Sequence, residues 1–482
     1  MIPSFILKSS IRLDRLFKAY AKKTALITQS GVWTFNDVRQ CLRTVIFNLE
    51  SAGVRKGHRV AFHGENSELH LYLFLASWVM GFLYIPLDFK SPLKRLIRGQ
   101  DIDFLIMAEE AAEIGRADHP IVLGPEAIMQ CLLPFPDSFT WPAISFQQEA
   151  SVIFTSGSTG KPKGLVHTVG NYVFSALGTN EFIGLSRSDR WLVSLPLFHV
   201  GGVLIWVRTL LSGGASILPA SLKAIDEAIK VHQPSVLSLV PAQLIRLLDN
   251  HEMAAILRSC RVILLGGAPP PAWLIEKALD LGIPVMPTYG STEACAQITG
   301  VALNDPRSAY RTAGRPVPYR EVRIDDDGSI LLGGKTIFKR YLTDEKSRHT
   351  RKDGFFKTAD AGCLDDNGNL VCLGRTDGVF ISGGENIHPF EIENHLLALE
   401  DVSAAFVVPV PHREFGKVPW AFVETSAAFD EGLVIAGLKK HLPGYKVPKR
   451  IIRLDPDEKK GKLKFSRDDL TALAGKMIQN RR

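Results

Sequence analysis

Short apolar runs alternate with helical patterns over most of the chain. Runs rich in β-branched residues and bounded by glycine, proline or charged residues are typical of buried strands. Strands are therefore predicted at Arg59–Gly64, Phe104–Ala108, Ser151–Thr155, Ser216–Pro219, Val236–Val240, Val262–Gly266 and Val285–Tyr289, and helices at Leu222–His232, Pro241–Asp249 and Pro271–Leu281. Because strand–helix alternation builds parallel sheets covered by helices, the pattern predicts an α/β architecture with largely parallel sheets.

The pattern changes toward the C-terminus. Arg320–Gly333 alternates around the acidic turn Asp326–Gly328, which predicts a β-hairpin. The acidic residues lack the further ligands of an EF-hand, so turn formation explains them better than calcium binding. The remaining residues predict a separate α+β domain, which divides the chain into 1–377 and 378–482. Its predicted elements are a helix at Pro389–Leu399 and strands at Ala404–Val410 and Ala421–Thr425.

Leu71–Leu87 carries no charged residue and approaches the length of a membrane span. Gly81 and Pro86 divide the segment, and no basic residues flank its near side. A buried helix that ends at Gly81, followed by a buried strand, explains the sequence better than a span.

Composition and charge narrow the class of protein. The chain has 482 residues, of which 46% are hydrophobic and 22% charged, as in soluble globular proteins of roughly two to four domains. The formal net charge of +7 fits either a solubilising surface or attraction to polyanionic small molecules. Scattered basic residues argue against nucleic acid binding. Six separated cysteines without a zinc spacing, and no signal-peptide pattern, lead us to expect a cytoplasmic protein.

The strand predicted at Ser151–Thr155 runs directly into a loop of small and basic residues, Ser156–Gly164. Small residues let backbone N–H groups approach phosphate oxygens, hydroxyl groups add donors, and Lys161 and Lys163 add positive charge. The loop lacks the GxxxxGK[ST] pattern of a P-loop. An ordinary Gly/Ser-rich turn is the alternative to a polyphosphate-binding loop.

The ten residues TSGSTGKPKG, Thr155–Gly164, resemble the characteristic loop of the adenylate-forming superfamily. This superfamily contains acyl- and aryl-CoA synthetases, luciferases and the adenylation domains of peptide synthetases. Each motif alone is weak, but the ordered set spans nearly the whole chain and is specific. The other matching motifs are Gly266–Ala268, Tyr289–Glu293, Phe356–Asp360, Gly374–Asp377, Ser382–Glu385 and Pro389–Glu393.

The resemblance implies a fold and a set of nucleotide-binding residues. The expected fold is a large N-terminal domain of parallel and mixed sheets with a small barrel-like subdomain, followed by a small mobile α+β domain. The resemblance implies that Glu293 and Thr155 bind Mg²⁺ and that Asp360 accepts hydrogen bonds from the ribose hydroxyls. A helix N-terminal charge and a turn cap are the respective alternatives for the two carboxylates. The implied ATP-binding residues are Thr155, Ser156, Gly157, Ser158, Thr159, Gly160, Lys161, Lys163, Gly266, Gly267, Ala268, Tyr289, Gly290, Ser291, Thr292, Asp360 and Arg375.

Two lysines compete for the role of the family's catalytic lysine. Counting back from Arg467 and Leu470 selects Lys464, whereas the more familiar Gly-Lys pair selects Lys462. We favour Lys464, because the downstream register fixes where the next helix begins. A solvated basic run is the alternative to either role.

The segment after Leu195 opens the acyl pocket in this superfamily, where the resemblance places His199 against the substrate carboxylate and Gly290 beside the acid. A packed structural histidine is the alternative for His199. Arg208 lies among apolar neighbours, where an unpaired charge is costly, so a dicarboxylate substrate would supply its partner. Together with the ending KLKFSRDDL, this region is similar to the o-succinylbenzoate–CoA ligases of menaquinone biosynthesis.

The implied reaction joins an acid to coenzyme A with consumption of ATP. Ser382, Gly383 and Gly384 would line the coenzyme A tunnel, and the small domain would rotate about Asp377 between the two half-reactions. The alternatives are another aryl- or acyl-CoA ligase, an adenylation enzyme that loads a carrier protein, and a non-catalytic relative. The sequence leaves open whether the chain forms a homo-oligomer.

Overall fold

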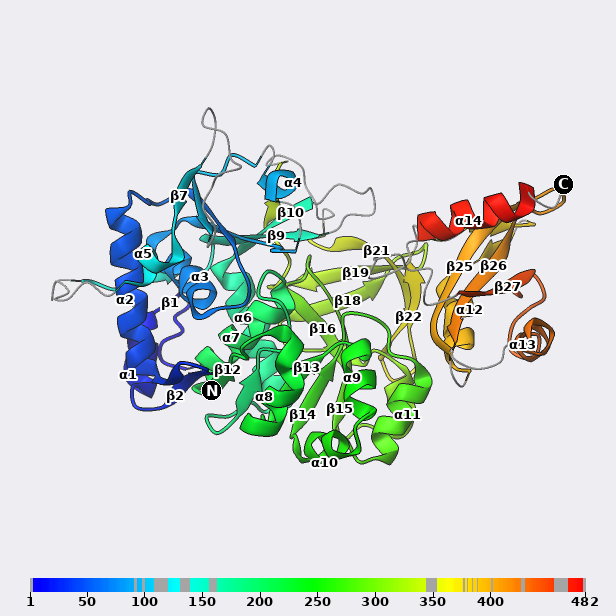
Figure 1. Ribbon diagram of the computed structural model, residues 1–482, viewed down its shortest axis with the longest axis horizontal. Coiled ribbons are helices and arrows are strands. Elements are labelled where there is room, and N and C mark those ends of the chain that lie inside the picture. The colour runs from blue at the N-terminus through cyan, green and yellow to red at the C-terminus, as the bar shows by residue number, and fades with distance from the viewer. Residues whose placement is uncertain are drawn as a thin grey trace.

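The computed structural model of the protein describes residues 3–90, 93–97, 100–107, 120–130, 139–155, 163–343, 353–375, 378, 380–383, 385–387, 389–399, 402–425, 430–454 and 467–479. Two large mixed sheets with helices between and around them form most of the molecule, and a smaller unit lies beyond them at one end (Figure 1).

The first sheet has seven strands and carries the phosphate-loop candidate. Its central strands pair in parallel, whereas β9 and β10 form an antiparallel pair and β10 also pairs antiparallel with β20. The order is β20 (Arg340–Tyr341), β10 (Lys163–Thr168), β9 (Glu149–Thr155), β5 (Leu83–Leu87), β4 (Arg59–His63), β6 (Phe104–Met107) and β7 (Ile121–Leu123).

The second sheet has nine strands, with six parallel strands in its middle and antiparallel strands at both edges. The prediction of largely parallel sheets is confirmed for the centre of both sheets. The order is β17 (Arg315–Pro316), β16 (Ala296–Gly300), β15 (Val285–Ser291), β14 (Val262–Leu265), β13 (Val236–Leu239), β11 (Arg190–Leu192), β12 (Ala215–Ile217), β2 (Thr24–Thr28) and β3 (Gly31–Thr34).

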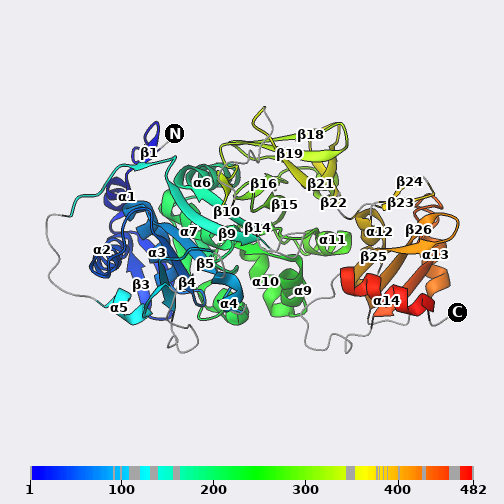
Figure 2. The ribbon, with the colours of Figure 1, turned by 90° about the horizontal axis from the view of Figure 1, so that it is seen from above.

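Helices fill the space between the sheets and cover their outer faces (Figure 2). Apolar side chains of α3, α6 and α7 belong to one large core with those of α1 and α2, and α8 to α11 pack on the second sheet. The helices are α1 (Leu13–Tyr20), α2 (Phe35–Ser51), α3 (Glu68–Met80), α4 (Leu93–Ile97), α5 (Pro125–Met129), α6 (Val169–Ile183), α7 (Val200–Ser212), α8 (Ile225–His232), α9 (Pro241–Leu248), α10 (His251–Ser259) and α11 (Ala272–Asp280).

The uncharged segment Leu71–Leu87 folds as predicted. Helix α3 ends at Gly81, which adopts the left-handed conformation (φ 77°) that glycine tolerates best, and β5 follows with all five residues buried. Among the described residues, no helix combines the length and the apolarity that a membrane span requires.

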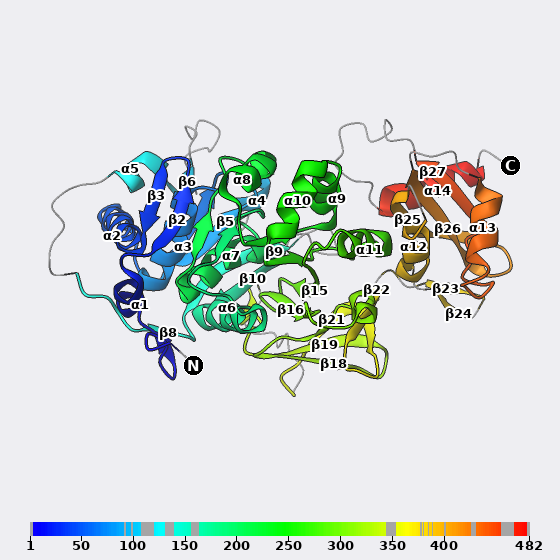
Figure 3. The same cartoon turned by 90° about the horizontal axis from the view of Figure 1, so that it is seen from below.

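A four-stranded antiparallel sheet carries the predicted hairpin. Strands β18 (Arg320–Ile324) and β19 (Ser329–Gly334) pair around the acidic turn, and β21 (Phe356–Leu364) and β22 (Leu370–Arg375) complete the sheet. This half-barrel matches the expected barrel-like subdomain, and it lies between the large sheets and the smaller unit (Figure 3).

The smaller unit has its own apolar cores and an α+β arrangement. Helix α12 (Pro389–Leu397) contacts β22 of the half-barrel sheet. The predicted boundary at Asp377 lies outside the described residues. The other elements are β23 (Phe380–Ser382), β24 (Glu385–Ile387), β25 (Val402–His412), β26 (Gly416–Thr425), β27 (Arg450–Leu454), α13 (Glu431–Leu438) and α14 (Arg467–Gln479).

Candidate active site

The phosphate-loop candidate is closed at its base by an antiparallel strand pair. Thr155 ends β9 and faces Lys163, the first residue of β10, and the Thr155 hydroxyl contacts the Lys163 carbonyl at 3.5 Å. The Lys163 ammonium lies 5.9 Å from the ring centre of Tyr341. Ser156–Pro162, which include the predicted Lys161, lie outside the described residues, so the loop is described only by its two ends.

Three of the predicted nucleotide residues lie together at the end of the half-barrel sheet. The Tyr289 hydroxyl donates a 2.7 Å hydrogen bond to Oδ2 of Asp360, and Arg375 Nη1 lies 3.7 Å from Oδ1 of the same carboxylate. Asp360 and Arg375 face each other across β21 and β22. The contact therefore joins the second large sheet to the half-barrel, and half of the Arg375 side chain stays exposed to a ligand.

The residues after Tyr289 are fixed by backbone contacts. His167 Nε2 lies 2.8 Å from the carbonyl oxygen of Thr292, and the carbonyl of Glu293 accepts a 2.8 Å hydrogen bond from the Phe338 amide. The Glu293 carboxylate acts electrostatically on Tyr341, where, after burial, it contributes to the raised pKa of that phenol. Glu293 and Lys163 thus both lie near Tyr341, at the base of the phosphate-loop candidate.

Two of the predicted glycines are explained by close approach. A side chain at Gly266 would bring its Cβ to 2.4 Å from the Thr288 hydroxyl oxygen, and one at Gly290 would lie 2.3 Å from the Ala296 carbonyl oxygen. Gly267 has a φ of 79°, and the neighbouring Ala268 is exposed. At Gly266 and Gly290 the backbone therefore passes too close to its neighbours to admit a side chain.

His199 precedes α7 as its N-cap residue, without a capping side-chain bond. Its ring lies 4.5 Å from that of Phe198, which in turn contacts Phe89. Partial burial lowers the pKa of His199, and the negative charge of Asp88 opposes this shift. Because its imidazole keeps exposed surface, His199 is not a packed core histidine.

Arg208 lies in the third turn of α7 and is 3% exposed. Its guanidinium carbon lies 5.2 Å from the ring centre of Trp191, and its buried Nε has no hydrogen-bond partner. Burial lowers the pKa of Arg208 to about 10, while the nearby thiol of Cys295 raises it. No carboxylate within the described ranges forms an ion pair with this guanidinium, so a buried cation faces aromatic and weakly polar groups.

The predicted coenzyme A residues lie in the smaller unit. Ser382 is buried in β23, and Gly383, with a φ of 58°, donates a backbone hydrogen bond to the Phe415 carbonyl. A Cβ at Gly383 would lie 2.9 Å from the Phe415 ring, so glycine is required here by the fold itself. Gly384, Asp377, Lys462 and Lys464 lie outside the described residues.

Two family models match this arrangement of sheets and motifs. The model described as "AMP-binding enzyme" matches residues 13–342, and that described as "AMP-binding enzyme C-terminal domain" matches residues 391–464. The chain belongs to the AMP-binding enzyme family. The ordered motifs that suggested adenylate-forming chemistry are therefore those of a true member, and the enzyme class is an AMP-forming acid–thiol ligase.

Several similar proteins are named as CoA ligases of 2-succinylbenzoate. A 2-succinylbenzoate–CoA ligase of Listeria monocytogenes is 32% identical over 465 residues, which cover 95% of this chain and 98% of that protein. One from Bacillus cereus is 30% identical over 467 residues, or 94% and 96% of the two chains. The Bacillus subtilis o-succinylbenzoate CoA synthetase with the acyl-adenylate OSB-AMP superposes with a TM-score of 0.81 at 28% identity, covering 92% and 94% of the chains. The same synthetase with ATP and magnesium gives 0.82 at 29% identity, covering 92% and 95%.

His167 is a residue of this site that the sequence alone did not single out. It follows the phosphate-loop candidate by only a few positions, in a strand whose residues are nearly all buried. A histidine inside such a strand signals a specific partner, because a buried ring nitrogen costs free energy unless it is hydrogen-bonded. Its partner, Thr292, lies 125 residues away in sequence.

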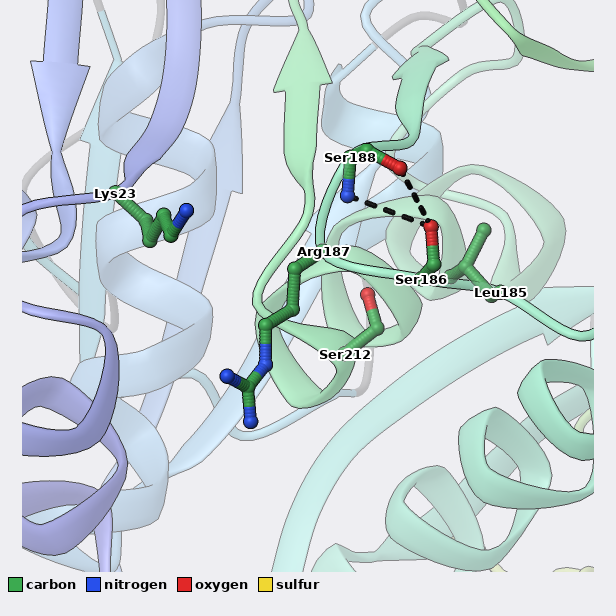
Figure 4. A pocket seen from close by; sticks show the side chains of 6 residues that line it. All are labelled: Lys23, Leu185, Ser186, Arg187, Ser188 and Ser212. Atoms are coloured by element: carbon green, nitrogen blue, oxygen red, sulfur yellow. Dashed lines mark hydrogen bonds between the residues drawn. The ribbon is translucent and has the colours of Figure 1, made fainter.

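A polar hollow of about 550 Å³ opens on another part of this AMP-binding enzyme and contains none of the predicted site residues (Figure 4). Lys23 follows the end of α1, and Ser212 ends α7. Basic side chains near helix C-termini are stabilised by the helix dipole, and Arg187 also stacks over Tyr20 at 5.2 Å. These contacts account for the basic side chains around the hollow. Its lining residues are Lys23, Leu185, Ser186, Arg187, Ser188 and Ser212.

Proposed function

We propose that this AMP-binding enzyme is an o-succinylbenzoate–CoA ligase that consumes ATP and passes through an acyl-adenylate. The observation that carries the choice of acid is Arg208, a buried guanidinium without a carboxylate partner in the described parts of the chain. The relatives named for 2-succinylbenzoate support the same acid. Its aromatic carboxylate would neutralise Arg208, while its aliphatic carboxylate reacts.

The first half-reaction brings two anions together, so it requires cations and donors around the phosphates. An oxygen of the aliphatic carboxylate attacks the α-phosphorus of ATP, the bond to the bridging oxygen breaks, and pyrophosphate leaves. Lys163 and the preceding loop would hold the phosphates, and Asp360 the ribose hydroxyls. His199 would lie beside the reacting carboxylate at the start of α7.

The site fits a magnesium ion. Mg²⁺ is usually held by one or two carboxylates together with substrate phosphates and water, and Glu293 supplies one half-buried carboxylate beside the phosphate-loop base. Thr155 would add a hydroxyl oxygen. When bound, the ion would supply positive charge to the phosphate oxygens.

In the second half-reaction the thiolate of coenzyme A attacks the acyl carbon, and AMP leaves with the electrons of the broken C–O bond. We propose that residues 378–482 rotate about Asp377 between the two steps. Lys464 serves the first step, and the segment Ser382–Gly384 faces the thiol substrate in the second. The resemblance to the family supports these assignments.

A thioester-formation screen tests the function. The full chain is mixed with ATP, Mg²⁺, coenzyme A and single acids: o-succinylbenzoate, 4-oxo-4-phenylbutanoate, benzoate and a medium-chain fatty acid. Thioester formation fastest with o-succinylbenzoate is expected. Preference for another acid would reassign the substrate but keep the reaction class. Acid-dependent pyrophosphate exchange without thioester would favour a carrier-protein-loading enzyme.

The assignment of Arg208 needs a separate measurement. Arg208→Ala should lower kcat/KM for o-succinylbenzoate roughly 100-fold or more, because a buried charge pair is lost. It should affect 4-oxo-4-phenylbutanoate, which lacks the aromatic carboxylate, much less. Equal losses for both acids would remove Arg208 from the acid site without changing the reaction class.

A further inference from the structure

A second arginine, Arg320, is buried in the same region of the large domain. It begins β18 and is 5% exposed. Its Nη1 donates to the Pro318 carbonyl at 2.9 Å, and its Nη2 lies 2.8 Å from the carbonyl oxygen and 2.9 Å from the hydroxyl oxygen of Ser175. All these partners are neutral, and the buried Nε has no partner. The Arg320 charge is therefore solvated by dipoles alone.

The fold is shaped to admit this guanidinium. A Cβ at Gly178, in the middle of α6, would lie 2.2 Å from Arg320 Nη1 and 2.3 Å from the Pro318 carbonyl oxygen. Glycine inside a helix costs about 1 kcal/mol relative to alanine. Helix α6 tolerates this cost at the one position where Arg320 and the chain before it press against the helix.

The contacts of Arg320 lead to both halves of the candidate active site. The Ser175 hydroxyl donates to the carbonyl oxygen of Cys295, which follows Glu293 by two residues. Helix α6 also holds α7, because the side-chain amide of Asn180 donates a 2.8 Å bond to the carbonyl of Arg208. Helix α6, which Arg320 contacts at Ser175, thus connects α7 to the segment that follows Glu293.

The guanidinium groups of Arg208 and Arg320 also interact electrostatically. Burial, and after it the positive charge of Arg208, lower the pKa of Arg320 to about 9. The Cys295 thiol interacts with both. Within the described ranges, neither arginine has a carboxylate partner. Two like charges share one buried region, so an anion that enters it is attracted by both.

We propose that Arg320 is a specificity-determining residue for the acid, because its charge adds to that of Arg208 and selects a substrate with a second carboxylate. This inference rests on the proposed function. Arg320 acts on the substrate through the field in the pocket and through the position of α7, without a required contact to the acid. The selected class is an aromatic keto acid that carries an additional anionic group.

Two acids that differ only in the aromatic carboxylate distinguish an electrostatic role of Arg320 from a structural one. Steady-state kcat/KM is measured for o-succinylbenzoate and for 4-oxo-4-phenylbutanoate with wild type, Arg320→Gln, Arg320→Lys and Arg323→Gln. Arg323 lies on the same strand with its side chain 58% exposed, so it is the matched control. Thermal unfolding and circular dichroism verify that each variant is folded.

The ratio of the two kcat/KM values is the decisive readout. Arg320→Gln should lower the ratio about tenfold, mainly through KM for o-succinylbenzoate. Arg320→Lys, which keeps the charge, and Arg323→Gln should stay within about twofold of wild type. If Arg320→Gln does not fold, Arg320→Lys is the variant that tests the proposal. A ratio of the two kcat/KM values well below that of wild type in Arg320→Lys would overturn it.

The outcomes separate this inference from the proposed function. Equal losses for both acids in Arg320→Gln would mean a purely structural role and overturn the proposal. A wild-type preference for the diacid that Arg320→Gln retains would do the same, while leaving the function intact. If the wild type has equal kcat/KM values for the two acids, the proposed substrate is wrong. The selective role assigned to Arg320 is then wrong as well.

Discussion

His167 Nε2 lies 2.8 Å from the carbonyl oxygen of Thr292, and this contact joins β10 to the segment that carries Glu293. A carbonyl oxygen only accepts hydrogen bonds, so Nε2 carries the proton. Burial lowers the pKa of His167 to about 4, which keeps the ring neutral at physiological pH. The strand that leaves the phosphate-loop candidate therefore fixes the backbone beside Glu293, the proposed magnesium ligand.

Replacement of His167 should affect the metal and nucleotide more than the acid. His167→Leu leaves a buried carbonyl without a donor, which costs about 1–3 kcal/mol in stability and loosens the backbone beside Glu293. We expect higher KM for MgATP and a higher Mg²⁺ requirement. His167→Gln places an amide nitrogen near the former Nε2 and should recover most of the loss. Equal damage in both variants would argue against the hydrogen bond as the cause.

The Tyr289–Asp360 contact predicts a nucleotide-specific effect. Tyr289→Phe removes a 2.7 Å hydrogen bond to the carboxylate that would hold the ribose. Without it, Asp360 loses its fixed orientation, and KM for ATP should rise about tenfold or more, because a hydrogen bond to a charged group contributes about 1.5–3 kcal/mol. KM for the acid should stay the same, which titration of each substrate at saturating levels of the others would verify. A change confined to the acid would contradict the assignment.

Stability should fall as the pH falls below about 6.5. Burial lowers the pKa of His70 to about 3 and that of His167 to about 4. The folded-state values lie below the unfolded value, so the unfolded chain binds protons first as the pH falls, and stability present above pH 6.5 is lost progressively down to the folded pKa. Each group should cost about 2 kcal/mol at pH 5. In unfolding titrations the stability of wild type relative to His167→Gln should therefore drop by that amount between about pH 7.5 and pH 5. A constant difference would refute the assigned pKa.

The sequence predicted the central strands well because strands buried on both faces read as continuous apolar runs. Helix α6 and strand β10 were not predicted. α6 is buried on nearly all sides and contains glycine, asparagine and threonine, so it lacks the one-sided apolar period of a surface helix. Each nucleotide motif is a short contiguous segment, so it could be predicted directly from the sequence. His167 and Arg320 could not, because their partners lie 125 and 145 residues away and only the folded sheets bring them together.

The proposed rotation of the small domain predicts that the two half-reactions can be affected separately. Proline at position 377 restricts the backbone angle that the proposed hinge must change. Asp377→Pro should spare acid-dependent pyrophosphate exchange and lower thioester formation from preformed acyl-adenylate. Asp377→Ala, which keeps backbone freedom, is the control and should retain both activities. Equal loss of both activities in the proline variant would remove the hinge from position 377.

The Glu393–Arg467 pair predicts a defect in the opposite half-reaction. Arg467 Nη2 lies 2.7 Å and 2.6 Å from the two oxygens of Glu393, whose Oε1 also accepts a 2.7 Å hydrogen bond from the Val407 amide. Glu393 is 4% exposed, so Arg467→Met leaves a buried carboxylate unpaired, at a cost of roughly 3 kcal/mol in folding stability.

Arg467 begins α14 three residues after Lys464, so the same substitution should also loosen the segment that carries the proposed catalytic lysine. We expect pyrophosphate exchange to fall about tenfold or more, with thioester formation from preformed acyl-adenylate nearly unchanged. Glu393→Gln combined with Arg467→Met removes both charges and should restore much of the thermal stability but not the exchange rate, because the anchor of α14 is still absent. Recovery of exchange in the double variant would show that stability alone, rather than placement of Lys464, limits the first half-reaction.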